Sequence, residues 1–548
     1  EVSRTTDAKF GDFSTNIALR VSHASKQSPQ ETAKILTDSL KDLPYVEKLE
    51  VAGPGFINFF IKSEYWQDQV SDVLILGEGF GSNDIGKDKK ARVEFVSANP
   101  TGPLHFGNAR GGPIGDVLAS VLEFSGYKVL REYYHNDVGE QVRKLGESIV
   151  NVAAGLKLED QEYKGEYVKD LANVILGSEA TPESKKADSG QARMTSDEVG
   201  KEAVDILLEE ILKDCRDMGI EFDKIFPESE FVNTGGTKEV LDHLREKGVL
   251  KEKEGALWFA PSDKFLNDRE TVVIKSDGTF TYFANDITYH NIKFQDGPNL
   301  VIDVFGANHH GHVPRLQAVV KALGYDVSRF HVILYQWVRF RKGKDILKMS
   351  KRSGTFVTAR EVLDEVGRDA LRFFILMHDP NSHIDFDMEL AKKKSKENPV
   401  YYIQYAHARI CSILAKTGPV SSFHPASARS SQIPKVGQKN SVELRAVGSP
   451  PTAATRFDLL TSEYEINLIK QLSRLPELVC DICESFAVHR LTTYATELAD
   501  SFHKFYENCR VVDENEDLMQ ARIALIQATK ITLVNTLKLL GISAPEKM

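Results

Sequence analysis

The chain has 548 residues, more than one ordinary hydrophobic core accommodates, so we expect three or four domains. Its 41% hydrophobic and 27% charged residues are typical of a globular protein in water, and no apolar run is long enough to predict a membrane-spanning segment. The formal net charge of −10 argues against indiscriminate nucleic-acid binding, but it is compatible with a local basic surface.

Cysteine usage bears on the cellular compartment. The five cysteines form no disulfide framework, which suits a reducing environment. The chain also starts without a charged and then apolar leader, so we expect a cytoplasmic protein without a membrane partner.

Residues 1–87 combine helix and strand signals. Apolar residues in Glu31–Leu40 have helical spacing, whereas Lys48–Ala52 and Phe56–Ile61 have the pattern of strands. We predict a small α+β domain here, followed by a turn-rich linker over Gly77–Lys90.

Residues 88–390 alternate between strand and helix signals. This order predicts a Rossmann-like domain with a doubly wound parallel sheet. A helical and polar insertion is expected near 136–265, and within it Gly177–Gly200 is predicted to be a flexible excursion. The candidate strands are Arg92–Val96, Lys128–Tyr133, Leu300–Phe305 and His331–Leu334.

Residues 391–548 carry helical signals, which predict an α-helical bundle. A loop rich in Ser, Pro and Gly is expected to interrupt the bundle near 421–455. Two sets of apolar residues each fall on one helical face: Leu491, Tyr494, Ala495, Leu498, Phe502 and Phe505, and then Leu518, Ala521, Leu525, Ala528, Ile531 and Val534.

The stretch NPTGPLHFGNARGG, from Asn99 to Gly112, places four glycines and two prolines around His105. Glycine lets a backbone approach a ligand closely, and an order of strand, glycine-rich loop and helix favours a site for anionic oxygen. The spacing fits neither a P-loop nor a dinucleotide-binding fingerprint.

A second stretch, LKMSKRSGTF from Leu347 to Phe356, places Lys348 and Lys351 on either side of Met-Ser. Mobile lysines suit charge that builds up on a triphosphate during a reaction. Thr358 and Glu361 then have the spacing of a capping box at the start of a helix.

Together these two stretches resemble the paired signatures of class I aminoacyl-tRNA synthetases, and further motifs narrow the resemblance to the arginyl-tRNA synthetases. The motifs occur in order along almost the whole chain. They are DFSTNIAL near the start, then SANPTGPLHFGNARG, EYYHNDVGEQV, TYFANDITYH and GANHHGHVPRL, and FYENCRVV near the end.

The resemblance implies a ligase that activates L-arginine with ATP and Mg²⁺ and transfers it to the 3′ end of tRNA(Arg). It implies a class I Rossmann-like catalytic domain over 88–390, a first domain that binds the tRNA elbow, and a helical domain over 391–548 that binds the anticodon. A monomer without a tightly bound metal ion is expected.

The resemblance also implies roles for single residues. His105 and Lys351 would stabilise the phosphate charge, with Lys348 in support. Asp286 would bind the guanidinium group, although an acid at the start of a helix is the commoner role of a lone aspartate. The ATP-binding residues would be Pro100, Thr101, Gly102, His105, Gly107, Asn108, Gly306, His309, Met349 and Ser350, and the arginine-binding residues Asn99, Glu228, Tyr282, Asp286 and His309.

One position departs from the family pattern, because Asn108 stands where the first signature usually ends in a second histidine. Asparagine still forms hydrogen bonds but cannot carry a proton's charge, so we expect an altered ATP contact.

Other functions stay open. One is a different class I synthetase, or a nucleotidyl transferase with the same ATP site; another is a catalytically weakened paralogue that acts as an RNA-binding protein. A metal hydrolase built on His309, His310 and His312, with Asp303 nearby, is the least favoured. Cys480 and Cys483 are interpreted as two buried thiols of a helix.

Overall fold

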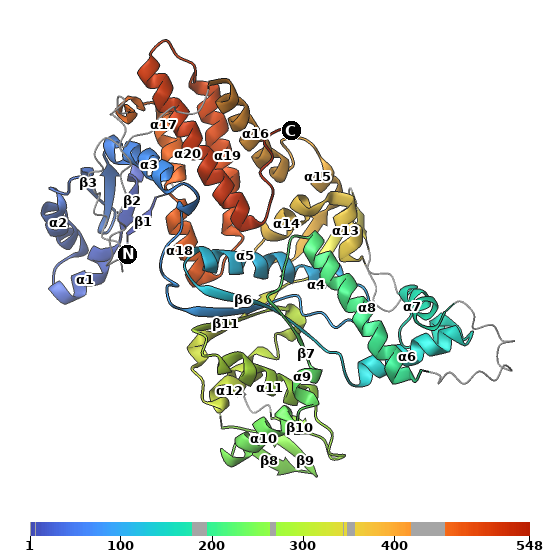
Figure 1. Ribbon diagram of the computed structural model, residues 1–548. Coiled ribbons are helices and arrows are strands. Elements are labelled where there is room, and N and C mark those ends of the chain that lie inside the picture. Colours follow the sequence, from blue (N-terminus) through green and yellow to red (C-terminus); the bar gives the residue numbers. More distant parts are fainter. Residues whose placement is uncertain are drawn as a thin grey trace, which may run out of the picture.

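The computed structural model describes residues 2–5, 7–177, 194–262, 270–342, 345–347, 357–417 and 455–548. A parallel sheet lies at the centre of the molecule (Figure 1). The N-terminal domain and the helical bundle lie on one side of this sheet, and helices α11 and α12 lie on the other.

The N-terminal domain is a four-stranded antiparallel sheet, in the order β1-β2-β4-β3, packed against two helices. The second helix begins with a capping box between Ser28 and Glu31. The helix and both strands predicted here are confirmed. The elements are β1 (Val2–Arg4), β2 (Phe13–Thr15), α1 (Ile17–Ser25), α2 (Pro29–Leu40), β3 (Val46–Ala52) and β4 (Phe56–Ile61). Helix α3 (Ser63–Leu76) follows and packs against the bundle helices α17 and α20.

The central sheet has five parallel strands in the order β12-β11-β5-β6-β7. The four predicted strands are confirmed, with ends that differ by one or two residues. The fifth strand, β7, is four residues long and lies inside the region expected to be a helical insertion, so the sequence pattern missed it. The strands are β5 (Lys90–Glu94), β6 (Lys128–His135), β7 (Lys224–Pro227), β11 (Leu300–Gly306) and β12 (Phe330–Tyr335).

Helix α5 (Gly111–Phe124) is buried over most of its length. One side contacts β5, β6 and β11, and the other contacts α14, α18 and α20, which explains why it is apolar around most of its surface. The short α4 (Phe106–Ala109) precedes it, and α11 (Tyr282–Gln295) and α12 (Val313–Leu323) cover the opposite face of the sheet (Figure 1).

The predicted insertion is two units separated by β7. Between β6 and β7, helices α6 (Glu140–Ala153), α7 (Tyr167–Leu176) and α8 (Ser196–Asp217) share a small apolar core. Between β7 and α11 the described residues form two helices and an antiparallel sheet: α9 (Ser229–Val232), α10 (Gly236–Glu246), β8 (Leu250–Lys253), β9 (Ala256–Phe259) and β10 (Thr271–Ile274).

The end of the predicted flexible excursion Gly177–Gly200 is wrong. Helix α8 already begins at Ser196, and its Gly200 packs so closely on α6 that a Cβ there would lie 2.3 Å from the Val142 carbonyl oxygen. Residues 178–193 lie outside the described residues.

A second small sheet, in the order β14-β13-β15, lies between the central sheet and the bundle in the chain. The predicted capping box of Thr358 and Glu361 opens the next helix and is confirmed. The elements are β13 (Val338–Lys342), β14 (Asp345–Leu347), α13 (Ala359–Val366), α14 (Arg368–Leu376), β15 (Ile384–Asp387) and α15 (Met388–Lys392).

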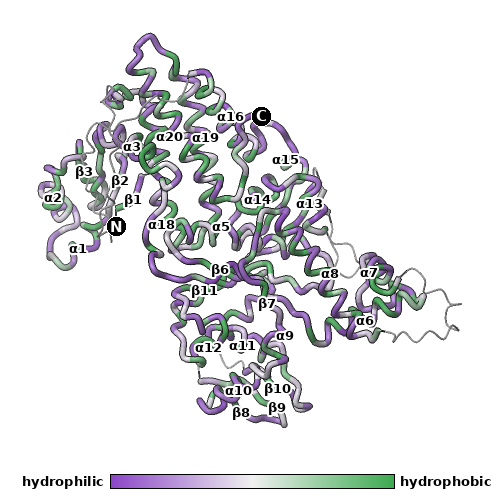
Figure 2. The backbone as a smooth tube through the Cα atoms, in the orientation of Figure 1, coloured by the Kyte–Doolittle hydropathy of each residue, from purple (hydrophilic) through white to green (hydrophobic). Residues whose placement is uncertain are grey.

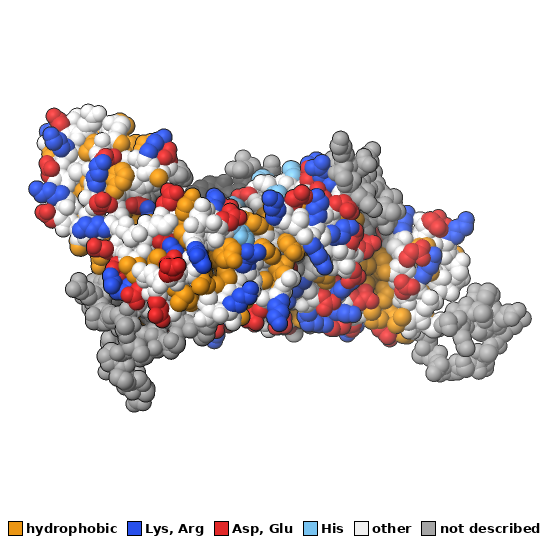
Figure 3. Space-filling model, turned by 90° about the horizontal axis from the view of Figure 1, so that it is seen from above, with side chains coloured by type: hydrophobic (Ala, Val, Ile, Leu, Met, Phe, Trp, Pro, Cys, Tyr) orange, Lys and Arg blue, Asp and Glu red, His pale blue; other side chains and the backbone are white. Residues whose placement is uncertain are grey.

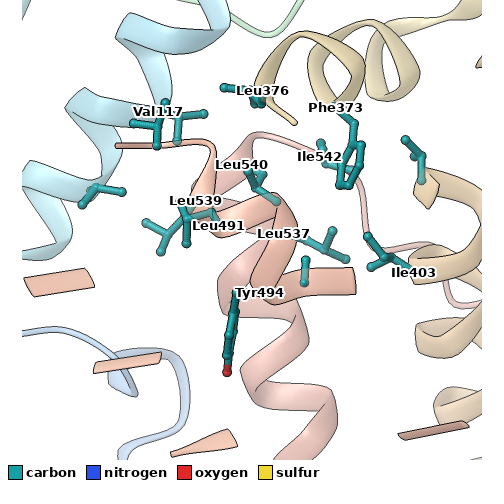
Figure 4. Packing of buried hydrophobic residues seen from close by; sticks show 14 of the residues in the cluster. Val117, Phe373, Leu376, Ile403, Leu491, Tyr494, Leu537, Leu539, Leu540 and Ile542 are labelled. Carbon is teal, nitrogen blue, oxygen red and sulfur yellow. The ribbon is translucent and has the colours of Figure 1, made fainter. Parts of the chain in front are cut away.

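The bundle consists of α16 (Pro399–Thr417), α17 (Glu463–Leu472), α18 (Leu475–Ser485), α19 (Arg490–Asn508) and α20 (Glu516–Leu540). The apolar face predicted on α19 is buried, as expected. For α20 a single apolar face is wrong, because Ile523, Ala524 and Ile526 are buried as well. Figure 4 shows the end of α20 packed among α5, α14 and α16. The loop expected near 421–455 lies outside the described residues, except for Thr455.

By length and composition alone, α20 is apolar enough to cross a membrane, which the sequence pattern did not predict. However, 72% of its most apolar window is buried inside the protein. Its apolar side chains therefore form core contacts.

Single 3₁₀ turns complete the described chain. They are Ala8–Phe10, Gly77–Gly79, Leu158–Asp160, Ala307–His309, Val327–Arg329 and Phe457–Leu459.

The fully buried guanidinium of Arg372 joins three parts of the fold. It donates to Asp116 Oδ2 on α5 at 2.6 Å, to the Leu540 carbonyl at the end of α20 at 2.9 Å, and to the Met218 carbonyl after α8 at 3.1 Å. Arg372→Met is expected to lower the melting temperature strongly, because removing one partner of a buried ion pair costs about 3–5 kcal/mol.

Lys538→Met is the matched control for thermal melting. This α20 lysine is 75% exposed, and its ion pair with the exposed Glu78, at 3.6 Å, should contribute little to stability. Equal melting temperatures of the two variants would show that Arg372 does not hold these parts together.

Candidate functional site

Predicted site residues follow the carboxyl ends of three parallel strands: Asn99 after β5, Glu228 after β7 and His309 after β11. Within the sheet, β6 and β7 lie on one side of β5, and the later strands β11 and β12 lie on its other side. Ligands of open parallel sheets bind at this point, where the strand order reverses. His312, after β11, pairs with Asp286 of α11, and Tyr335 OH at the end of β12 donates to the Asn108 carbonyl beyond the loop after β5.

Strand β5 ends in an abrupt turn. Val96 has a φ of 66° and Ser97 a φ of 38°, a region that β-branched residues rarely adopt, so the strand predicted to reach Val96 stops at Glu94. Strand β6 holds the turn, because Tyr134 N donates to Ser97 Oγ at 3.1 Å and Tyr133 OH donates to the Ala98 carbonyl at 2.6 Å.

The turn leads directly to the first residues that were predicted to bind arginine or ATP. Asn99 Nδ2 donates to Oε1 of Gln141, near the start of α6, at 3.1 Å. Tyr167 OH donates to the Thr101 carbonyl at 2.8 Å, and a Cβ on Gly102 would lie 3.2 Å from that hydroxyl. The loop that contains Pro100, Thr101 and Gly102 is thus fixed by the α6–α8 unit.

His105 has a defined orientation at the start of α4. Its Nδ1 accepts from the Gly107 N–H at 2.8 Å, so the proton of the neutral ring is on Nε2. A Cβ on residue 107 would lie 2.8 Å from that Nδ1, which explains the glycine. Asn108 is exposed, and its carbonyl accepts from Tyr335 OH at 3.3 Å.

The chain after the second signature contacts this loop. Phe106 N donates to the Val357 carbonyl at 3.1 Å, and Ala359 N donates to the Leu104 carbonyl at 2.8 Å. The chain that follows the second signature therefore lies against the His105 loop. Lys348, Met349, Ser350 and Lys351 themselves lie outside the described residues.

Glu228 is a buried carboxylate, 3% exposed, directly after β7. Its Oε1 accepts from Asn285 Nδ2 at 2.7 Å and from Tyr134 OH at 3.0 Å. Burial, helped by the nearby Asp286 and Asp137, raises the pKa of Glu228 to about 7.

Asp286 lies on the second turn of α11, which begins at Tyr282, so the alternative role as a helix-start acid is wrong. Its Oδ2 is 2.9 Å from His312 Nε2. Desolvation of the ring, together with the neighbouring His312, lowers the pKa of His309. Gly306 ends β11 ahead of His309, and Tyr282 is 56% exposed at the start of α11.

The site also contains residues that the sequence analysis did not predict to bind arginine or ATP. Gln141, Asn285 and Tyr134 form hydrogen bonds with residues that were predicted to bind arginine, and His312 pairs with Asp286. All four lie inside the quoted motifs EYYHNDVGEQV, TYFANDITYH and GANHHGHVPRL, which were the available signal.

Among the residues that the structure describes, no three His, Cys, Asp or Glu side chains lie so that they could together hold a metal ion. The histidine cluster instead divides, because His312 pairs with Asp286 while His310 is exposed. The prediction of two buried thiols is correct for Cys483, whose Sγ donates to Ser125 Oγ at 2.9 Å, and wrong for Cys480, which is only partly buried.

Comparison with known proteins assigns the family. Residues 69–387 match the family described as tRNA synthetases class I (R), catalytic domain. Residues 1–61 match the arginyl tRNA synthetase N terminal domain, and 403–548 match the DALR anticodon binding domain. The chain belongs to the arginyl-tRNA synthetase family.

Individual relatives agree with this family. An arginine–tRNA ligase of Geobacter sp. (strain M21) is 42% identical over 556 residues, covering 100% of this chain and 94% of the relative. That of Staphylococcus carnosus is 40% identical, covering 99% and 93%. The solved arginyl-tRNA synthetase of Thermus thermophilus shares the fold, with a TM-score of 0.75 at 23% identity over 100% of this chain and 96% of that one.

The predicted fold class is thereby confirmed: a class I catalytic domain with a parallel sheet, an N-terminal domain and a helical C-terminal domain. The resemblance that the motifs indicated is also confirmed.

The raised pKa of Glu228 predicts a pH-dependent stability. A carboxyl group whose pKa is higher in the folded state favours folding at low pH, and this contribution disappears as the pH rises through about 7. Relative to the wild type, the free energy of unfolding of Glu228→Gln is expected to rise by up to about 2 kcal/mol between pH 5.5 and pH 8, which unfolding measured at each pH will show.

Glu230→Gln, two residues further along on exposed α9 surface, is the control and should show no such trend. A difference between Glu228→Gln and the wild type that stays constant across this pH range would refute the raised pKa.

Proposed function

We propose that this protein is an arginine–tRNA ligase, which activates L-arginine with ATP and transfers it to the 3′ end of tRNA(Arg) for protein synthesis. The observation that carries the proposal is a pair of carboxylates at the start of α11: Glu228, which follows β7, accepts from Asn285 of α11, and the next residue, Asp286, pairs with His312 after β11. The relatives named arginine–tRNA ligase match along the whole chain and support it.

Arginine recognition requires a carboxylate, because the guanidinium group is always charged and presents a planar fork of donors. Asp286 suits this role: its contact with His312 leaves further acceptor positions on the carboxylate. Asn99 and Glu228 would hold the amino end of the substrate, and Tyr282 and His309 would line the pocket.

In the first step, an oxygen of the arginine carboxylate bonds to the α-phosphorus of ATP and pyrophosphate leaves. A terminal ribose hydroxyl of the tRNA then attacks the arginyl carbonyl carbon, and AMP leaves. The protein supplies no covalent nucleophile, so its contribution is positioning and charge stabilisation. We assign phosphate stabilisation to Nε2–H of His105 and to Lys351, with Lys348 in support.

ATP enters as its Mg²⁺ complex, which is part of the substrate. The backbone of Pro100–Gly102, Gly107 and Gly306 would lie against the nucleotide, with Asn108, Met349 and Ser350 as further contacts. Cytoplasmic location and a monomeric state without membrane contact belong to the same proposal.

We assign tRNA binding to the bundle and to the N-terminal domain. A groove of about 860 Å³ runs between α16, α19 and the chain end. In it the Arg409 guanidinium lies over the rings of Tyr405 and Tyr506, at 5.2 and 5.0 Å. Aromatic faces beside fixed cations suit unstacked bases and phosphates, and Arg510 and Lys547 also line the groove.

Charge on the rest of the bundle is mixed. Arg490 and Lys504 are exposed but pair with Asp481 and Asp500, at 2.9 and 2.7 Å. Figure 3 shows basic and acidic side chains interspersed on the face that it presents. With a net charge of −10, local features such as this groove must provide the attraction for tRNA.

Pyrophosphate exchange with each amino acid, with and without total tRNA, tests the proposed function. Exchange that depends on arginine supports it. Exchange with lysine or glutamate in place of arginine would overturn the specificity. Binding of tRNA without any exchange would favour the alternative, a weakened paralogue that binds RNA.

Asp286→Asn keeps the shape of the side chain and removes its charge, so arginine binding should weaken while ATP binding changes little. Loss of one partner of a buried charged pair costs on the order of 2–5 kcal/mol, or roughly 30-fold or more in the KM for arginine. Glu230→Gln, an exposed carboxylate on α9, is the control. An unchanged KM for arginine removes Asp286 from the pocket.

Arg409→Gln should raise the KM for tRNA about tenfold and lower the salt dependence of tRNA binding by about one phosphate contact. At saturating tRNA the KM for arginine should not change. Arg490→Gln, a paired surface arginine of the same bundle, is the matched control. If both variants lose tRNA affinity equally, the groove has no special role.

A further inference from the structure

A cluster of six ionisable side chains is buried between the central sheet and α11. Lys293 Nζ is 2.5 Å from Asp303 Oδ1 and also contacts Glu94 Oε2. These three side chains are at most 3% exposed. The members of this buried ion cluster are Arg92, Glu94, Glu132, His290, Lys293 and Asp303.

The remaining contacts bind the cluster to α11. Arg92 forms a two-pronged pair with Glu132, Nη2 to Oε1 at 2.6 Å and Nε to Oε2 at 3.2 Å, and its Nη1 donates to the Lys293 carbonyl at 3.1 Å. The His290 ring lies between two acceptors, the Asp286 carbonyl at 2.7 Å and Asp303 Oδ2 at 3.0 Å. It donates to both when each ring nitrogen carries a proton.

The cluster interrupts a region that is usually apolar. Figure 2 shows hydrophilic residues along β6 in the middle of the sheet. Replacing a buried ion pair by apolar residues is often neutral or stabilising, so stability alone does not explain these charges. Directional contacts do, however, fix how α11 lies on β5 and β11, which apolar packing fixes less strictly.

Three of the four segments that carry proposed arginine-binding residues are connected to this cluster. Glu94 hydrogen-bonds to Ser97, in the strained turn two residues before Asn99. Asp303 precedes Gly306 and the loop of His309 on the same strand. His290 contacts the backbone of Asp286, one helical turn away.

We propose that Lys293 and His290 are positioning residues for arginine recognition, which act through Glu94 and Asp303 to hold the turn before Asn99, α11 with Asp286, and the loop after β11 in one arrangement. This inference rests on the proposed arginine site. Neither side chain needs to contact the substrate.

Lys293→Met tests the inference in the full-length chain. It removes the cation and leaves two buried carboxylates, so the KM for arginine in tRNA-dependent pyrophosphate exchange should rise at least tenfold at pH 8. The KM for ATP should stay within twofold. A merely structural role would lower the melting temperature, or change both constants together, without this selectivity.

The pH profile gives a second readout. Burial already raises the pKa of Glu94 beside Lys293, and loss of the lysine leaves Asp303 as an uncompensated like charge. A lower pH therefore favours a proton on this pair, and this proton replaces the lost cation. The ratio of the KM for arginine between Lys293→Met and wild type should therefore fall toward one from pH 8 to pH 6. Glu228 is present in both proteins, so the effect of its titration on the KM for arginine cancels in this ratio.

The other groups around Lys293 are His290 and Tyr289 of α11, Arg92 of β5 and Glu132 of β6; the Tyr289 ring lies 4.5 Å from its Nζ. They remain in place in the variant. The charge-balanced double variant Lys293→Met/Asp303→Asn should therefore fold and show a raised KM for arginine. Its ratio should change less with pH than that of Lys293→Met, because Glu94 no longer faces the like charge of Asp303.

The outcomes separate the two proposals. If the wild type shows no arginine-dependent pyrophosphate exchange, the proposed function is wrong. If the wild type is arginine-specific but Lys293→Met has an unchanged KM for arginine, or loses ATP and arginine affinity together, the positioning role is wrong. If Lys293→Met does not fold, a wild-type KM for arginine in the double variant overturns the role instead.

Discussion

The forced turn at the end of β5 determines the geometry of the site. A β-branched residue in the left-handed region is strained by about 1–3 kcal/mol, and it persists only where the surroundings hold it. Here the hydrogen bonds from Tyr133 and Tyr134 hold it, together with the contact of Ser97 and Glu94. The chain therefore leaves the sheet abruptly and brings the polar loop of Asn99 and His105 over the carboxyl ends of the strands.

The same loop continues into α5, which links the two halves of the molecule. One side of α5 packs on the central sheet, and the other contacts α14, α18 and α20 (Figure 4). The helix that follows the His105 loop is thus a core element of both the catalytic domain and the bundle. One continuous apolar core consequently includes Val96 and Ala98, just before this loop, and Cys509 and Val511, which line the proposed tRNA groove.

Local patterns in the sequence predicted most of the fold. The capping box at Thr358 depends on neighbouring residues and was correct, as were four parallel strands and the face of α19. Tertiary packing decided the failures. Val96 is a good strand former that the surrounding contacts force into a turn, β7 is too short for a pattern, and α20 is surrounded by other helices.

The candidate site was predictable only through its motifs. These contain Asn99 and Asp286, whereas Glu228 lies outside the quoted motifs, and the partners of all three residues depend on the folded chain. The contact of Glu94 with Lys293 joins positions 199 residues apart, so no spacing rule reveals it.

A crystal structure of the protein with a non-hydrolysable analogue of arginyl-adenylate tests the central claim most directly. The predicted result is the guanidinium group within hydrogen-bond distance of the Asp286 carboxylate, the amino group near Asn99 and Glu228, and the phosphate mimic beside His105. An analogue bound with its guanidinium group away from Asp286, or away from the ends of β5 and β11, would contradict it.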